Sequence, residues 1–136
     1  MATVPIRALT AQQVTHAIIT AAMKVHTEPG PGLLESTYTA CLQYELGKAG
    51  VESATQVGLP VIYFGVKLEL GYRMDLLAEN LVVVEIKSVE AISPVHQAQI
   101  LSYLKLSGKS LGLLINFNVV HLKDGIKRFV NGTEWK

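Results

Sequence analysis

The residues best suited to chemistry lie in one apolar run, Leu81-Val82-Val83-Val84-Glu85-Ile86-Lys87. Side chains alternate across a β-strand, so Glu85 and Lys87 would share one face with Leu81 and Val83. Three consecutive valines predict a strand that is buried on both faces. An unpaired carboxylate there would cost several kcal/mol in desolvation, so Glu85 needs a compensating partner. Lys87 could supply it, although Glu-x-Lys taken alone fits an ordinary ion pair at a solvated sheet edge equally well.

The preceding strand-like run brings in a second carboxylate, Asp75. If the chain reverses at Ala78-Glu79-Asn80 as a hairpin, Asp75 lies roughly across from Glu85. Two carboxylates brought this close repel each other, and one takes up a proton unless a cation lies between them. Mg²⁺ suits such a position because it prefers oxygen ligands and usually takes one or two carboxylates. The sequence has no His/Cys cluster with zinc spacing, so we expect a divalent-metal site at Asp75 and Glu85.

Helical signals flank these strands on both sides. Thr10 and Gln13 have the spacing of a capping box before a helix, and Glu28-Pro29-Gly30-Pro31-Gly32 must end that helix. Ser93 and Pro94 are typical of the first positions of another. Helices are expected over about residues 11–26, 33–49 and 94–106.

The rest of the ordered pattern is strand-like. Strands are expected over about residues 53–64, 66–76, 81–88, 111–117 and 126–130. The order of elements predicts an α/β (α+β) fold with a mixed central β-sheet flanked by helices. A length of 136 residues fits a single domain, residues 1–136, with a full hydrophobic core.

Composition is that of a globular protein, with 49% apolar and 17% charged residues. The net charge of +1 argues against binding nucleic acid through overall positive charge and leaves local basic patches open. The single cysteine, Cys41, excludes an intramolecular disulfide and is more typical of a buried structural residue than of a reactive thiol. The amino-terminal segment has no apolar core of signal-peptide length, and no apolar run is long enough to span a membrane. We expect a soluble, cytoplasmic protein.

The spacing of Asp75 and Glu85-Ile86-Lys87 resembles the D…(D/E)-x-K signature of the PD-(D/E)XK nuclease superfamily. The segment Gly32–Tyr38 resembles the motif that names the GxxExxY family, a branch of that superfamily. Gln99–Tyr103 resembles the QxxxY element of its exonuclease-like members. The likeness covers roughly residues 10 to 130. It departs at Met74, where the superfamily name has proline, a position that varies among branches.

The resemblance implies a restriction-endonuclease-like core and a Mg²⁺- or Mn²⁺-dependent nuclease that hydrolyses phosphodiester bonds, in DNA rather than RNA. The implied metal ligands are Glu35, Asp75, Glu85 and the backbone carbonyl of Ile86. Lys87 would position the attacking water or stabilise charge in the transition state, and Gln99 would orient Lys87 or that water. The implied substrate contacts are Tyr38, Arg73 and Tyr103.

Several of these residues have a simpler structural interpretation. Glu35 would be stabilised by the helix dipole as an acid near a helix N-terminus, and Tyr38 fits a core aromatic with a hydrogen-bonded hydroxyl. Basic side chains that could contact phosphates are solvated surface charges by default: Arg73, Lys123, Lys127 and Arg128. His26, His96 and His121 are expected to be ordinary hydrogen-bonded histidines.

Two other functions stay open. One is a nuclease-fold module that binds nucleic acid or a protein partner without cutting it, which the intact set Asp75, Glu85, Lys87 and Gln99 disfavours. The other is a structural protein with a buried polar network, which would bind no metal. A carboxyl-terminal edge strand could also support a homodimer.

Overall fold

The computed structural model describes residues 8–132, and the expected helices are present within that range. The elements are α1 (Ala11–Thr27), α2 (Glu35–Lys48), β1 (Ser53–Gly58), β2 (Val61–Tyr63), β3 (Val66–Leu68), β4 (Arg73–Ala78), β5 (Val82–Lys87), α3 (Pro94–Ser107), β6 (Leu111–Asn116), the 3-10 turn η1 (Leu122–Gly125) and β7 (Ile126–Val130). The predicted capping box of Thr10 and Gln13 opens α1. Ser93 caps α3 together with His96, whose ring accepts the Ser93 N–H.

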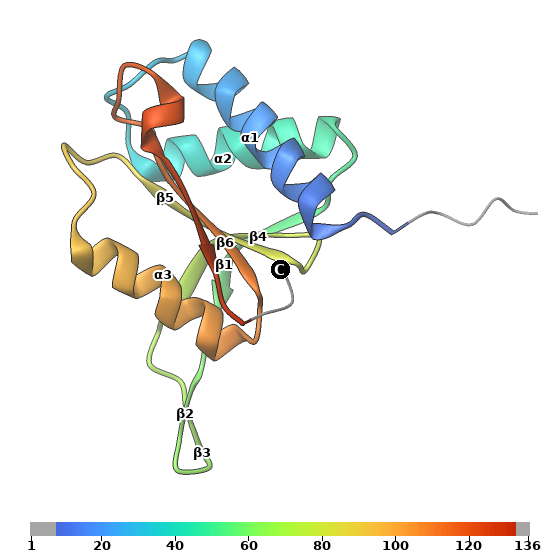
Figure 1. Cartoon of the computed structure of the whole chain (residues 1–136), viewed down its shortest axis with the longest axis vertical. Helices are drawn as coiled ribbons and strands as arrows, with labels where there is room; N and C mark the ends of the chain where they lie inside the picture. The colour runs from blue at the N-terminus through green and yellow to red at the C-terminus, as the bar shows by residue number, and fades with distance from the viewer. Residues whose placement is uncertain (1–7, 133–136) are drawn as a thin grey trace, which may run out of the picture.

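Five strands form the central sheet in the order β1-β4-β5-β6-β7. Only the β5–β6 pair is parallel among these neighbours, and α3 connects its two strands. Figure 1 shows α1 and α2 together on one side of the molecule and α3 apart from them. The predicted mixed sheet flanked by helices is therefore confirmed. Across residues 8–132, none of the helices has the length and apolar character needed to cross a membrane.

The two faces of β5 contact different helices. Val82, Val84 and Ile86 are fully buried in the larger core, together with residues of α1 and α2. Val83 is also fully buried but belongs to a second cluster that contains Tyr103 of α3. Because side chains alternate along a strand, Glu85 and Lys87 share the face of Val83. The strand therefore directs its two charged side chains towards the α3 side of the sheet.

The turn between β4 and β5 sets which residues face each other. Glu79 and Asn80 both have positive φ, 51° and 55°, and the N–H of Leu81 donates to the carbonyl of Ala78 at 2.9 Å. These values fit a type I′ turn, and three residues, 79–81, lie between the first paired residues of the two strands, Ala78 and Val82. The strands then pair antiparallel, with Leu76 opposite Val84 and Leu77 opposite Val83. Continued one step past the last pair, Leu76 and Val84, this register puts Asp75 across from Glu85, as predicted.

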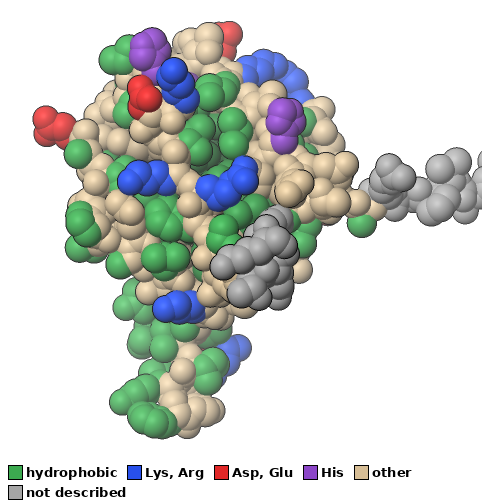
Figure 2. Space-filling model, viewed as in Figure 1, with side chains coloured by type: hydrophobic (Ala, Val, Ile, Leu, Met, Phe, Trp, Pro, Cys, Tyr) green, Lys and Arg blue, Asp and Glu red, His purple; other side chains and the backbone are tan. Residues whose placement is uncertain are grey.

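Two of the predicted strands were too long. The run 53–64 divides at Leu59-Pro60, where proline lacks an N–H for a sheet ladder. The run 66–76 divides at Gly71, which has a φ of 82°. The inner halves, β2 and β3, form a separate antiparallel hairpin that projects from the body of the molecule (Figure 1). Hydrophobic side chains gather on this hairpin (Figure 2).

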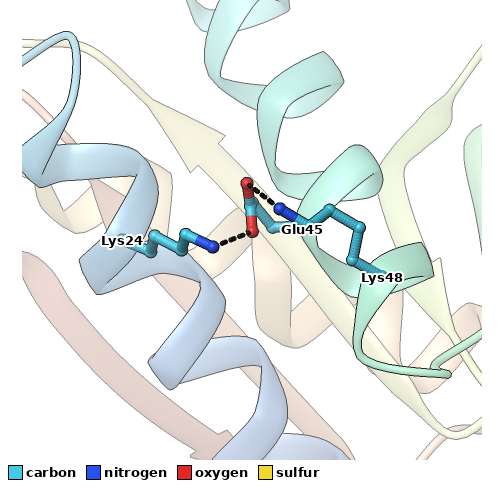
Figure 3. A network of polar contacts seen from close by, with 3 residues as sticks. All are labelled: Lys24, Glu45 and Lys48. Carbon is cyan, nitrogen blue, oxygen red and sulfur yellow. Dashed lines mark ion pairs between the residues drawn. The ribbon is translucent and has the colours of Figure 1, made fainter.

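Helices α1 and α2 are joined by apolar packing and by one small charge network. Glu45 of α2 lies 3.2 Å from the Lys24 ammonium of α1 and 3.7 Å from that of Lys48 (Figure 3). Beneath it, the buried side chains of both helices pack against the sheet, and the partly exposed Cys41 packs at the edge of this core. This packing fixes the start of α2, and with it Glu35, relative to the end of β5.

Candidate active site

Asp75 lies in β4 at the point where its pairing with β5 stops. The last paired residues are Leu76 and Val84, and beyond them the Asp75 carboxylate Oδ2 accepts the backbone N–H of Ile86 at 2.8 Å. A side chain thus takes the place of a ladder hydrogen bond. This contact holds the Asp75 carboxylate beside β5, next to Glu85.

Glu85 is an acidic side chain buried in the interior of the protein. It is only 2% exposed, and its Oε1 has no hydrogen-bond partner within the described residues. Burial, followed by the hydrogen bond and the negative charge of Asp75, raises the pKa of Glu85 to about 9, while the charge of Lys87 acts in the opposite direction. Without a cation, Glu85 therefore keeps a proton at neutral pH.

This pair fits a hard divalent cation. Buried polar atoms in proteins nearly always have a partner, and a cation between Glu85 and Asp75 would supply one to the orphaned Oε1. Mg²⁺ and Mn²⁺ take oxygen ligands of this kind and keep several waters, so two carboxylates suffice. Among the described residues, Asp75 and Glu85 are a pair of carboxylates that could hold such an ion.

A residue of α3, the helix that covers this face of the sheet, holds Lys87 by a hydrogen bond. Its ammonium Nζ donates to the side-chain oxygen of Gln99 at 3.4 Å, and the Gln99 amide nitrogen donates to the Tyr103 hydroxyl at 3.1 Å. Gln99 and Tyr103 share a helix face because they are four residues apart. Burial and then the charge of Glu85 raise the pKa of Tyr103. The structure therefore connects the predicted QxxxY residues directly to the predicted lysine.

Glycine at position 112 sets how closely α3 approaches the sheet. A Cβ there would lie 3.0 Å from Ile100 Cδ1 and 3.3 Å from Leu104 Cδ2. The absence of that atom lets the helix sit directly on β6. The same helix carries Gln99, so this close contact helps to fix the position of its amide beside Lys87.

Glu35, the first residue of α2, lies beside the end of β5 but makes a different contact from the one predicted. Its Oε2 accepts the backbone N–H of Ser88 at 3.1 Å, and the Ser88 hydroxyl donates to the carbonyl of Leu33 at 2.6 Å. In residues 8–132 no three side chains of the His, Cys, Asp or Glu type are grouped so as to hold a metal ion. The structure therefore does not bring Glu35 into one cluster with Asp75 and Glu85. The side chain of Ile86 is in the core, and the metal contact predicted for its carbonyl stays a prediction.

The predicted substrate contact of Tyr38 needs correction. Its side chain is fully buried, and its ring stacks on Phe117 with 4.4 Å between centroids. Its hydroxyl donates to the carbonyl of Gly30 at 2.5 Å and accepts the N–H of Leu33 at 3.1 Å. Tyr38 is a core aromatic that fixes the loop before α2, which closes it off from a substrate. Arg73 is exposed at the start of β4, where its phosphate contact stays a prediction.

Two residues near the site were not predicted. Asn116 is 2% exposed, and its amide holds the loop after β5 by accepting the N–H of Val89 at 3.1 Å and donating to the Val89 carbonyl at 2.9 Å. The sequence did offer a signal for Asn116, because a polar residue inside the apolar run 111–117 indicates a buried side chain with hydrogen-bond partners. Tyr72 lines a cavity of about 300 Å³ with Gln99 and Tyr103, which we call the Tyr72–Tyr103 cavity.

A mixed five-stranded sheet with an aspartate and a Glu-x-Lys segment on neighbouring strands is consistent with a restriction-endonuclease-like fold. The chain belongs to the PD-(D/E)XK nuclease superfamily, whose family model matches residues 12–129. Members of this superfamily are typically nucleases and usually use divalent metals such as Mg²⁺. No curated protein and no solved structure matches the chain.

Proposed function

We propose that this protein is a Mg²⁺- or Mn²⁺-dependent nuclease of the GxxExxY branch that hydrolyses phosphodiester bonds in DNA rather than RNA. The observation that supports it best is the orphaned Oε1 of buried Glu85 opposite Asp75. Such a pair is unfavourable in a purely structural role, because replacing a buried charge cluster by apolar residues is often neutral or stabilising. A role in binding a cation explains why both carboxylates are present.

Asp75 and Glu85 would hold the ion, with Glu35 and the carbonyl of Ile86 as proposed additional ligands. When bound, the ion would polarise the phosphate and lower the pKa of a bound water. Lys87, oriented by Gln99 at 3.4 Å, would place its positive charge where negative charge develops on the phosphate. Gln99 is in turn oriented by Tyr103, so the lysine has a preorganised position.

The test is a panel of single-stranded, blunt duplex and overhanging DNA, with RNA of the same sequence, incubated with Mg²⁺ or Mn²⁺. We expect wild-type protein to release product from DNA and Lys87→Ala to release at least about a hundredfold less, as when one transition-state contact is removed. Lys48→Ala is the matched control because Lys48 lies on α2 and pairs with Glu45. Folded wild-type protein that cuts none of these substrates with either metal would contradict the proposal.

Metal binding without product in that panel would instead favour a non-catalytic module that binds nucleic acid or a protein partner. The cytoplasmic location and the homodimer expected from the sequence also stay predictions. Neither is needed for the chemistry proposed for Asp75, Glu85 and Lys87.

A further inference from the structure

The Tyr72–Tyr103 cavity lies between the base of the projecting hairpin and α3. Its volume is about 300 Å³. It is lined by Val61, Tyr72, Gln99, Ser102, Tyr103 and Leu106. Val61 begins β2, Tyr72 directly precedes β4, and the other four residues belong to α3. Two segments far apart in the sequence therefore form its opposite walls, and Figure 1 shows the hairpin emerging beside α3.

The walls of this cavity are aromatic and apolar, with a polar rim. The rings of Tyr72 and Tyr103 lie 6.4 Å apart between centroids at an interplanar angle of 61°. Tyr72 is 48% exposed, so its ring is accessible to a ligand. The Gln99 amide and the Ser102 hydroxyl supply groups able to form hydrogen bonds.

One residue, Gln99, belongs both to the lining of the cavity and to the candidate active site. Gln99 lines the cavity, donates to Tyr103 and accepts from the Lys87 ammonium. A ligand group in the cavity would therefore lie one side chain away from Lys87. A nucleotide whose base occupied the cavity would have its phosphate in the neighbourhood of the lysine and the carboxylate pair.

The lining of the cavity suits a base better than a phosphate. None of the described residues that line it is charged, so a free phosphate would gain nothing inside. Two exposed cations are next to lining residues in the sequence, since Arg73 follows Tyr72 and Lys105 precedes Leu106. Uncharged walls with aromatic rings suit a flat base within, with its phosphates outside the cavity.

We propose that the Tyr72–Tyr103 cavity binds one base of an unpaired nucleotide, so that the protein prefers single-stranded nucleic acid or unpaired ends. This inference rests on the proposed nuclease function. Aromatic side chains stack on bases of any sequence, because every base has a π-face. A base inside a duplex is stacked and paired, and it would first have to be extruded. The preference therefore follows from the shape of the cavity and not from base-specific contacts.

The test measures binding by fluorescence anisotropy in EDTA, so that no metal-dependent cleavage occurs. The probes are a labelled single-stranded DNA, the same sequence as RNA, its duplex, and a single strand in which abasic positions replace the bases. We expect Tyr72→Ala to weaken single-strand binding roughly five- to hundredfold, the range found when a stacking ring is removed, and to leave duplex binding unchanged. Tyr72→Phe should bind like wild type because it keeps the ring.

Tyr44→Ala is the matched control, because Tyr44 is 65% exposed on α2 and lies outside the cavity lining. It should leave all affinities within about twofold, as expected of a surface site without the ligand. Abasic probes should bind wild-type protein as weakly as the intact strand binds Tyr72→Ala. Equal affinities of wild type and Tyr72→Ala for the single strand, or an equal loss for strand and duplex, would overturn the proposal.

The same set of proteins separates this proposal from the nuclease proposal. DNA cleavage by wild type together with unchanged single-strand affinity in Tyr72→Ala would remove the base cavity and leave the nuclease. A selective loss of single-strand binding in Tyr72→Ala without any cleavage by wild type would support the base cavity and contradict the nuclease proposal. The RNA arm shows whether the cavity accepts both kinds of strand.

Discussion

Asp75 and Glu85 face each other across β4 and β5, and the buried Oε1 of Glu85 lacks a hydrogen-bond partner within the described residues. The Asp75 carboxylate accepts the backbone N–H of Ile86 at 2.8 Å, so the desolvation cost of the pair is borne mainly by Glu85. In the absence of a cation, a proton on Glu85 relieves the repulsion. A metal ion bound at this site would therefore compete with a proton for the same carboxylate, and the first prediction and the closing measurement rest on this competition.

The first prediction concerns stability against pH without metal. The folded protein keeps the Glu85 proton up to a pKa of about 9, whereas the unfolded chain releases it near 4.5. The free energy of unfolding should therefore fall as pH rises between these values, by at most about 1.4 kcal/mol per pH unit from this group. Glu85→Gln removes that contribution, so it should be more stable than wild type near pH 8 and similar near pH 4.

Urea unfolding in EDTA across that pH range measures the difference between the two proteins. All other titrating groups are shared, so the difference isolates Glu85. Asp124→Asn, an exposed acid in η1, is the control and should follow wild type at every pH. A constant difference between wild type and Glu85→Gln over the whole range would show that Glu85 is ionised in the folded protein.

The second prediction concerns Gln99. Gln99→Ala removes the hydrogen bond to the Lys87 ammonium, and a bond to a charged group contributes about 1.5–3 kcal/mol, so kcat should fall about ten- to hundredfold. Gln97→Ala, two residues earlier on α3, should retain wild-type kcat. Steady-state cleavage of an overhanging duplex measures both. A rise in KM at constant kcat in Gln99→Ala would place Gln99 in substrate binding alone.

The third prediction concerns Tyr38. Tyr38→Phe leaves the Gly30 carbonyl and the Leu33 N–H without their hydroxyl partner, which should cost about 1–3 kcal/mol of unfolding free energy. Tyr44→Phe, on the exposed side of α2, should cost almost nothing. Chemical denaturation gives the stability, and product release gives the activity. Wild-type stability together with a loss of cleavage in Tyr38→Phe would contradict this and support a substrate contact of Tyr38.

The fourth prediction compares two glycines. In Gly112→Ala the added Cβ meets the mobile ends of the Ile100 and Leu104 side chains, so overpacking should cost about 1–3 kcal/mol. In Gly125→Ala it meets the backbone carbonyl oxygen of Asn116, which cannot turn away. Thermal unfolding should therefore show the larger loss for Gly125→Ala. The opposite order would mean that the chain around η1 adjusts more easily than α3 does.

The sequence was sufficient for the elements that carry the carboxylate pair. Alternation predicted which side chains of β4 and β5 share a face, and the tight turn expected near Ala78 to Asn80 predicted that Asp75 lies roughly across from Glu85. The division of the strand runs was missed because Leu59-Pro60 and Gly71 are short interruptions inside otherwise strand-like stretches. A pattern of alternating side chains is judged over a whole window of residues, so one or two residues that break it go unnoticed, although each break is enough to separate a hairpin from the sheet.

The contacts of Glu35, Tyr38 and Asn116 could not be obtained in this way. Glu35 meets Ser88 only because the start of α2 packs beside the end of β5, a relationship without a local sequence signal. For Tyr38 both a core position and a site position fitted the helical pattern, and the stacking on Phe117 decides between them. Tyr72 entered the cavity only through the placement of the β2–β3 hairpin.

The most direct measurement is calorimetric titration of Mn²⁺ into wild-type protein and Glu85→Gln, in two buffers of different ionisation enthalpy. Because Glu85 must lose its proton to bind a cation, wild type near pH 7.5 should bind Mn²⁺ and release about one proton per ion. Glu85→Gln should bind far more weakly, without proton release. Equal Mn²⁺ affinity in the two proteins, or no binding by wild type, would contradict a metal site at Asp75 and Glu85.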